Sequence, residues 1–290
     1  MCLIIALGQS CKPDSNTSNK EEEIWKLGWR MIESSWNEDF TKVDQQFDSL
    51  QNMSDRIDDK FLITGIEAKI ELSRIEAAVH IISLQSDEFI RNICDRNLVR
   101  ELEICVDVPS EKVQKEELKL EIIKMLVDDQ AVRGNLETDL IAKYNIDTTT
   151  IITDDISGVD LRNRTRLMEI TEEYGFPTRE LIGKEGMDAI FLFIQHADMD
   201  KEWQKSQLPN IENAVKQGDL DGASYAYLYD RIKINSGNPQ RYGTQFSMVD
   251  PVNKTVELAA TEDLENLDQR RREKGMMPIE LYKKVMLRNF

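Results

Sequence analysis

The N-terminal part of the chain is almost free of the residues that interrupt helices. No proline lies between Pro13 and Pro109, and only three glycines occur in the first 133 residues. Glycine and proline are the strongest local breakers of regular structure, so a long stretch without them favours helix. We therefore expect residues 21–108 to form helices joined by short connections.

Apolar residues in this region recur at helical spacing in three stripes. The stripes begin at Ile24, Phe40 and Phe61, and each repeats every three or four residues, as in a helix with one buried face. We expect helical hairpins, with Gly28 and Gly65 where two helices approach closely. Such hairpins resemble tetratricopeptide-like repeats, although the glycines are 37 residues apart rather than the usual spacing of about 34. Any helical bundle would show the same pattern.

Residues 109–290 carry the signals of a second domain, in which helices dominate. The expected elements are a helix capped by Ser110 and ending near Gly134, a loop at 146–157 with a short strand at 150–152, a helix capped by Asp160 and ending at Gly175, a buried helix at 186–194, a helix at 221–234, a β-hairpin of strands 241–246 and 255–258, and helices at 262–274 and 278–287. The predicted fold class is thus mainly α: helical N-terminal hairpins followed by an α-helical domain carrying a small β-hairpin.

The first 20 residues resemble the leader and tether of a bacterial lipoprotein. A short apolar run at 2–7 is followed by small and polar residues, then by Cys11, and then by a polar stretch. The resemblance implies that Cys11 is lipidated and that the protein is anchored in the bacterial cell envelope. No basic residue precedes the apolar run, which departs from such signals. The alternative is an unstructured leader on a cytoplasmic protein.

The charge balance excludes several classes of partner. The chain has 54 acidic and 37 basic residues and a formal net charge of −17. Nucleic acids and anionic membrane surfaces are held by clusters of Lys and Arg, so neither is expected as a partner. No apolar run is long enough to span a bilayer, which leaves a lipid anchor as the only expected membrane attachment.

Motifs for common cofactors are absent, and we predict no cofactor and no metal. There is no phosphate-binding loop, dinucleotide-binding glycine motif or zinc-protease motif. The acidic residues at 198–202 match the first positions of a calcium-binding loop, but Trp203 occupies the position at which that loop requires glycine. Cys94 and Cys105 can form a disulfide if the protein is exported, although their spacing does not decide this.

The most informative polar segment follows the most apolar helix. Residues 186–194 run into Gln195-His196-Ala197-Asp198, and His196 is one of only two histidines in the chain. An imidazole at the end of a buried helix suits a general base or a ligand contact, oriented by Asp198 or Asp200. The alternative is a structural histidine in the core, with Asp198 or Asp200 capping a helix that begins at Lys201.

Further polar motifs follow that segment: Gln204, Asp230-Arg231 and Gln240-Arg241-Tyr242-Gly243-Thr244-Gln245. Together with residues 195–198 they resemble a bacterial family catalogued as domain of unknown function 6624. The resemblance covers roughly residues 115–285 and implies a fold unit with a polar site, without indicating a reaction. Its motifs contain His196 and Asp198, which we treat as candidate catalytic residues. They also contain candidate ligand-binding residues: Asp129, Gln130, Arg133, Gln195, Gln204, Asp230, Arg231, Gln240, Tyr242, Thr244 and Gln245.

Two functions are consistent with these residues. In the first, the C-terminal domain binds a polar small molecule or substrate around His196; no activated nucleophile is evident, so catalysis stays open. In the second, the chain is a non-catalytic interaction or scaffold protein. Its N-terminal helices would then bind another envelope protein, and the C-terminal motifs would be structural. The two differ in whether Asp129, His196, Asp230 and Gln245 meet in one pocket that reaches solvent.

Overall fold

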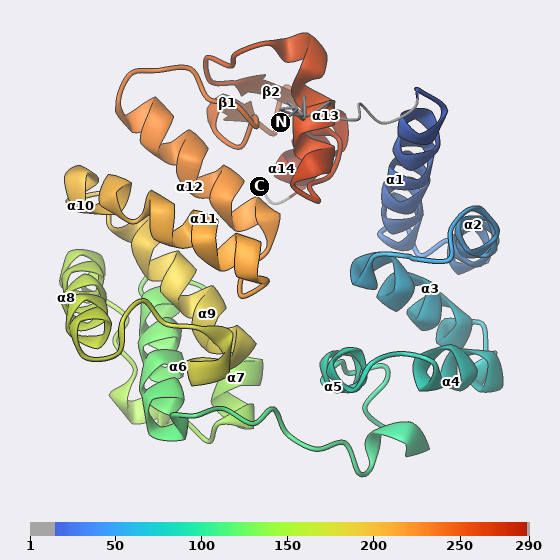
Figure 1. Cartoon of the computed structure of the whole chain (residues 1–290), viewed down its shortest axis with the longest axis horizontal. Helices are drawn as coiled ribbons and strands as arrows, with labels where there is room; N and C mark the ends of the chain where they lie inside the picture. Colours follow the sequence, from blue (N-terminus) through green and yellow to red (C-terminus); the bar gives the residue numbers. More distant parts are fainter. Residues whose placement is uncertain (1–14, 289–290) are drawn as a thin grey trace, which may run out of the picture. The chain divides into compact units, whose positions relative to one another are not determined.

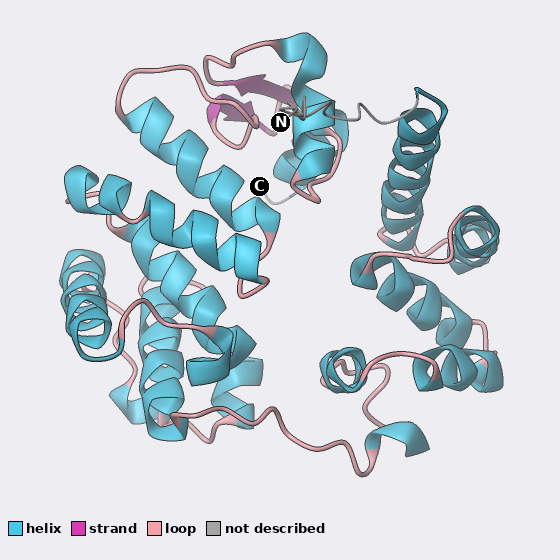
Figure 2. Ribbon diagram, viewed as in Figure 1, coloured by secondary structure: helices cyan, strands magenta, loops and turns pink. Residues whose placement is uncertain are grey.

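The computed structural model describes residues 15–288 and divides the chain into two compact units, Met1–Pro109 and Ser110–Phe290 (Figure 1). Helices dominate both units, and a two-stranded antiparallel sheet lies in the second unit (Figure 2). The predicted fold class is confirmed. Within the described part of the chain, no helix is both long enough and apolar enough to cross a membrane. Cys11 lies outside the described residues.

The first unit is a succession of helices, as the apolar stripes predict. Its elements are α1 (Ser15–Ser35), α2 (Phe40–Met53), α3 (Asp59–Glu71), α4 (Ile75–Ser83), α5 (Asp87–Cys94) and a 3-10 turn, η1 (Glu103–Cys105). Helix α1 packs against α2 and α3, and α3 also packs against α4. Because α1 begins at Ser15, the end of the predicted tether belongs to a helix.

The two glycines of this unit are positions of close helix approach. A Cβ atom at Gly28 would overlap the ring of Phe61, and one at Gly65 would overlap the ring of Phe47. Both phenylalanines are buried, so neither ring has free space into which it can move. The predicted role of Gly28 and Gly65 is confirmed, whereas a relationship to tetratricopeptide repeats stays a prediction.

A disulfide closes the end of the first unit. Cys94, the last residue of α5, is bonded to Cys105 in η1, with a Cα–Cα distance of 5.5 Å. The two cysteines pack against a buried cluster that includes Ile66, Ile82 and Phe89. The bond therefore ties the segment after α5 to the core of this unit.

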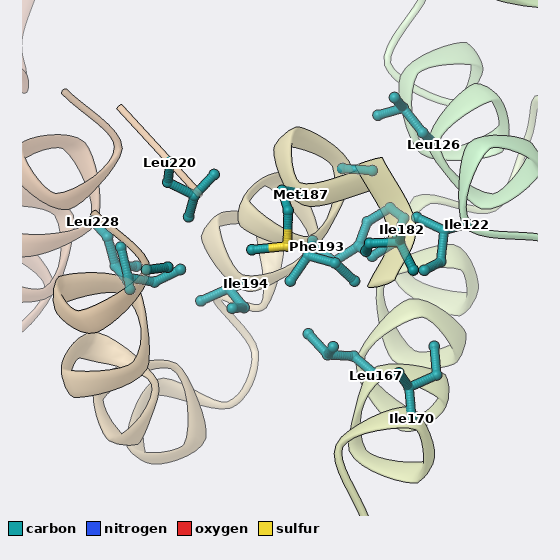
Figure 3. Close-up of a cluster of buried hydrophobic side chains, with 14 of the residues drawn as sticks. Ile122, Leu126, Leu167, Ile170, Ile182, Met187, Phe193, Ile194, Leu220 and Leu228 are labelled. Atoms are coloured by element: carbon teal, nitrogen blue, oxygen red, sulfur yellow. The ribbon is translucent and has the colours of Figure 1, made fainter. Parts of the chain in front are cut away.

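The second unit is built around one central helix, α9. Its elements are α6 (Glu116–Ala131), α7 (Thr138–Lys143), η2 (Thr148–Thr150), α8 (Ile156–Tyr174), α9 (Arg179–His196), α10 (Lys201–Ser206), α11 (Leu208–Gln217), α12 (Gly222–Asn235), β1 (Phe246–Asp250), β2 (Thr255–Leu258), η3 (Leu264–Asn266), α13 (Leu267–Glu273) and α14 (Ile279–Arg288). Helix α9 contacts α6, α8 and α12. Figure 3 shows Phe193 and Ile194 of α9 between side chains of α6 and α8 on one side and Leu228 of α12 on the other.

Two predicted helix starts in this unit are wrong. The helix expected from Ser110 begins at Glu116, because the N–H groups of Gln114 and Lys115 donate to the carbonyls of Glu180 and Leu181 in the first turn of α9 instead. The next helix is capped by Asp155, whose carboxylate accepts the N–H of Gly158 at 2.8 Å. Asp160, the predicted cap, therefore lies inside α8, and its carboxylate accepts a hydrogen bond from Arg133 instead.

Of the three predicted strands, the one at 150–152 is wrong, the one at 241–246 is displaced, and the one at 255–258 is confirmed. Residues 148–150 form a 3-10 turn capped by Asp147, and no strand follows at 150–152. The hairpin exists, but β1 begins at Phe246 rather than at Arg241, since the preceding backbone is bound by a buried carboxylate described below. In the turn that joins the two strands, Asp250 accepts the N–H of Asn253. Likewise, the helix expected from 262 starts as η3.

Substituting Gly65 by Ala tests the close approach in the first unit. The added methyl group overlaps the buried ring of Phe47, and overpacking of this kind costs about 1–3 kcal/mol. We expect the free energy of unfolding from denaturant titration to fall, despite the better helix propensity of Ala. Glu71→Ala at the exposed end of the same helix is the matched control. An unchanged stability for Gly65→Ala would show that the two helices have room to separate.

Candidate functional site

The side chain of His196 is paired with a buried carboxylate from another helix. Its Nδ1 atom lies 3.1 and 2.9 Å from the two carboxylate oxygens of Asp129 on α6. Asp129 is fully buried, whereas the His196 side chain is 16% exposed. An ionised carboxylate can only accept, so Nδ1 carries the proton, and in the neutral imidazole Nε2 then keeps its lone pair. The expectation that Asp198 or Asp200 orients the imidazole is wrong.

Asp129 accepts further hydrogen bonds that hold it in one orientation. Oδ1 also lies 3.2 Å from Nη1 of Arg133 and 3.4 Å from the amide nitrogen of the buried Asn163. Oδ2 accepts the side-chain amide of Gln130 at 2.8 Å. Both oxygens are thus occupied by donors from α6, α8 and α9, as a buried carboxylate requires. The carboxylate is a fixed acceptor that sets the tautomer of His196.

Arg133 and Asp160 complete this cluster. The Arg133 guanidinium donates to the backbone carbonyl of Asp129 at 2.7 Å and to Asp160 Oδ1 at 2.5 Å. Asp129, Asp160 and His196 each offer one ligand atom, and these atoms lie within 4.8 Å of one another. The set could hold a metal ion by spacing alone. The guanidinium already contacts both carboxylates, however, and a metal would have to compete with that charge.

Asp198 belongs to a separate ion pair on the loop after α9. Arg231 of α12 binds it with two donors, Nε to Oδ1 at 2.8 Å and Nη2 to Oδ2. Partial burial raises the pKa of Asp198, but the hydrogen bonds and charge of Arg231 outweigh this and leave the pKa below its ordinary value. A carboxylate with a lowered pKa is a poor base. The role of Asp198 in this structure is therefore to anchor the loop after α9.

The residues around Asp198 secure the same loop. Asp200 caps α10 by accepting the N–H of Trp203 at 3.1 Å, and it binds Nη1 of Arg164 on α8 at 2.6 Å. The buried Gln204 donates to the carbonyls of Ile194 and Gln195 at the end of α9. The capping role that the sequence offered as an alternative is therefore confirmed for Asp200. Through His196, Asp198 and Asp200, one short segment is bound to α6, α12 and α8.

A second polar cluster surrounds Asp230 on α12. This fully buried carboxylate accepts the backbone N–H groups of Arg241, Tyr242 and Thr244 at 2.8–3.0 Å, and also the Thr244 hydroxyl. Burial raises the pKa of Asp230, and the hydrogen bonds only partly oppose that rise. The N–H groups that a strand would have used are consumed here, which explains the late start of β1.

Gln240 and Arg271 close the loop at 240–245. Gln240 is fully buried; its side-chain amide donates to the Gln245 carbonyl at 2.8 Å, and its oxygen accepts the Gln245 N–H at 2.8 Å. Arg271, also fully buried, donates to the carbonyl of Tyr242 at 2.6 Å. Gly243 has φ +67°, a conformation that favours glycine. These motif residues hold the loop in shape, and their polar groups bind other parts of the chain.

The structure brings Asp129, Gln130, Arg133 and His196 together, and it gathers Asp230, Gln240, Tyr242, Thr244 and Gln245 elsewhere. Among residues 15–288, no hydrogen bond or ion pair joins the first set to the second. The side chain of Gln195 makes no hydrogen bond within the described residues. Sequence reasoning missed Asp160, Asn163 and Arg164 as members of the site. Their spacing on one face of α8 was the available signal.

The fold and this site define a class: a helical domain in which a buried aspartate fixes a histidine at the end of the central helix. The chain belongs to the family of unknown function 6624 (DUF6624), whose model matches residues 116–290. The predicted resemblance is confirmed, and the matched region contains both polar clusters. No curated protein and no solved structure matches the chain.

Replacing Asp129 by Asn tests the anchoring of His196. The amide cannot accept with both of its terminal atoms, so buried donors on α6, α8 and α9 lose their partner. We expect a loss of about 2–4 kcal/mol in the free energy of unfolding, because a buried charged network is broken. Asp139→Asn, at an exposed position of α7, is the control and should change stability by less than about 0.5 kcal/mol. Equal effects of the two variants would contradict the anchoring role.

The ion pair of Asp198 predicts a defined pH dependence. Its pKa in the folded state is below the ordinary 3.8. The pair therefore stabilises the fold above the unfolded-state pKa, and that contribution is lost as pH falls through the folded-state value. Arg231→Met removes the two largest causes that lower the pKa of Asp198 and leaves burial opposed only by the amides of Gln204 and Asn235. The carboxyl NMR titration of Asp198 should therefore move to higher pH. Lys112→Met, an exposed change, should leave the titration in place, and an unmoved Asp198 in Arg231→Met would remove Arg231 as the cause.

Proposed function

We propose that the second unit binds a polar small molecule at Nε2 of His196. The observation that carries the proposal is the asymmetry of the imidazole: Nδ1 is bound by the buried Asp129, while Nε2 makes no hydrogen bond to the described part of the chain. A histidine held this way presents a lone pair of fixed direction. The ligand group that fits it is a hydroxyl or amine that donates a hydrogen bond.

The partial exposure of the polar side chains around His196 supports ligand binding by this histidine rather than a purely structural role. The His196 and Arg133 side chains are 16% and 23% exposed, and the amide of Gln195 is available on the same turn of α9. The Asp230 cluster is different, since its buried groups bind one another. A histidine that served only the core would bind the fold through both nitrogens.

Acid–base chemistry is a natural extension of this geometry. If the ligand donates from a hydroxyl or a water molecule, Nε2 can take that proton while Asp129 stabilises the resulting imidazolium. No cofactor is required for this step, and we propose that Arg133 supplies the positive charge between Asp129 and Asp160 that a metal would otherwise give. Whether turnover follows binding depends on the ligand.

We also propose that the protein resides in the bacterial cell envelope, anchored by a lipid on Cys11. The Cys94–Cys105 disulfide supports an exported protein, because disulfides persist in oxidising compartments and are rare in the cytoplasm. This placement would give the polar site access to small molecules outside the cytoplasm.

A second candidate function is protein binding by the first unit. A cavity of about 460 Å³ lies between the α2–α3 and α4–α5 connections. It is lined by polar and apolar side chains, among them Gln51, Asp55, Arg56, Leu84 and Gln85. Leu84 is 69% exposed, so a partner covering this hollow would bury apolar surface. The scaffold interpretation thus concerns the first unit and is compatible with a ligand in the second.

The two histidines make the ligand proposal directly measurable. An NMR spectrum of isotope-labelled histidine side chains contains two signals, one from His196 and one from His80, which is exposed on α4. We expect a panel of sugars, amino acids and organic acids at about 1 mM to contain compounds that shift the His196 signal and leave His80 unchanged. Binding should be lost in His196→Ala and retained in His80→Ala.

Two results would contradict the proposal. If no compound in the panel shifts His196 selectively, its free nitrogen is not a ligand contact. If Zn²⁺ alone shifts His196 with an affinity near or below about 1 µM, the Asp129–Asp160–His196 set is a metal site instead. Asp160→Asn separates these cases, because it removes one possible metal ligand and leaves the Asp129–His196 pair intact.

A further inference from the structure

Three tyrosine rings form a cluster on α12 and the loop that follows it. Tyr225 and Tyr229 lie one helical turn apart with ring centroids separated by 5.8 Å. Tyr242 stands nearly perpendicular to both, at 6.3 and 5.8 Å. Tyr242 is 7% exposed, while Tyr225 and Tyr229 are half-buried. We refer to these three residues as the tyrosine cluster.

The hydroxyl groups of this cluster have no partner in the described part of the chain. Buried tyrosines usually find a hydrogen-bond acceptor for the hydroxyl group. None of the three hydroxyls makes such a bond to residues 15–288. Burial is the main cause that raises the pKa of Tyr242 to about 12, and the neighbouring Tyr225 adds to the rise. The Tyr242 hydroxyl therefore keeps its proton at neutral pH and can donate a hydrogen bond. The cluster therefore presents three donors that lack an acceptor.

Two lysines flank the rings without an acidic partner. Lys274 Nζ lies 4.7 Å from the ring centroid of Tyr225, and Lys233 Nζ lies 5.3 Å from that of Tyr229. Neither lysine forms an ion pair with a described residue, although the chain carries a net charge of −17. The nearby carboxylate of Glu212 is bound by Lys216 at 2.9 Å. The rings of Tyr225 and Tyr229 thus each have an ammonium group beside them in an otherwise acidic protein.

The fold fixes these groups relative to one another. Tyr225, Tyr229 and Lys233 follow each other at four-residue intervals on α12, so they share one face of the helix. A Cβ atom at Gly222 would lie 3.0 Å from the backbone oxygen of Lys274, which shows how closely the start of α12 packs against that residue. Lys274 is held beside Tyr225 by this contact.

We propose that the tyrosine cluster, Lys233 and Lys274 form a second ligand site, which binds an anionic small molecule through a phosphate or carboxylate group. The site offers hydroxyl and ammonium donors, which are the groups that bind an oxyanion. The partly exposed rings of Tyr225 and Tyr229 supply the contact surface for a sugar or other carbon skeleton that carries the anion. This site is independent of His196.

Calorimetry with the purified full chain tests the site with four probes: glucose 6-phosphate, glucuronate, inorganic phosphate and glucose. We expect at least one of the three anions to bind and neutral glucose to bind more weakly than its charged derivatives. Removing both ammonium groups in Lys233→Ala/Lys274→Ala should weaken anion binding by about tenfold or more. Tyr229→Phe, which removes only a hydroxyl, should weaken it by about threefold.

Matched controls keep the test decisive. Lys112→Ala removes an exposed lysine elsewhere in the same unit, and Tyr174→Phe removes a hydroxyl outside the cluster; both should bind as the wild type does. An unchanged unfolding midpoint shows that a variant is folded. Phosphate-only binding would assign the site to phosphoryl groups, and glucuronate binding would assign it to carboxylates as well. No binding by any anion, or equal binding by the double variant, would overturn the proposal.

Discussion

The second unit depends on one buried carboxylate. Asp129 is fully buried and collects donors from His196 of α9, Asn163 of α8, Gln130 of its own helix, and Arg133 in the turn that follows that helix. An unpaired charge in such a place would cost several kcal/mol. The packing of α6, α8 and α9 against one another and the position of the imidazole are therefore set by the same group. A structural requirement and a functional geometry coincide there.

Helices were predictable because their signals are local. Apolar spacing and scarce breakers locate α1, α2 and α3, and Gly28 and Gly65 mark close approaches without any three-dimensional information. Prediction failed where a distant carboxylate competes for backbone donors. The run from Arg241 has the residue types of a strand, yet Asp230 takes its N–H groups. Such competition depends on tertiary contacts between segments that no periodicity connects.

The candidate site was predictable only in part for the same reason. His196 stands out because it ends the most apolar helix, but its partner lies 67 residues earlier in the chain. Spacing along one helix suggested Asp198 and Asp200 instead, and both prove to anchor the loop through Arg231 and Arg164. Family motifs identified most of the polar residues without separating those that form a site from those that hold a loop.

The candidate site residues differ from the loop-holding residues in whether their polar atoms are already hydrogen-bonded within the fold. Around Asp230, the buried donors and acceptors bind one another, so that network has nothing left to offer a ligand. Within residues 15–288, one ring nitrogen of His196 is bound and the other is not, and the three hydroxyls of the tyrosine cluster have no acceptor. Since buried polar groups are normally satisfied within a fold, the partly exposed groups left open at fixed positions are where we propose that ligands bind. Motif residues of one family can therefore divide into scaffold and site, and the division follows from which bonds the fold leaves unmade.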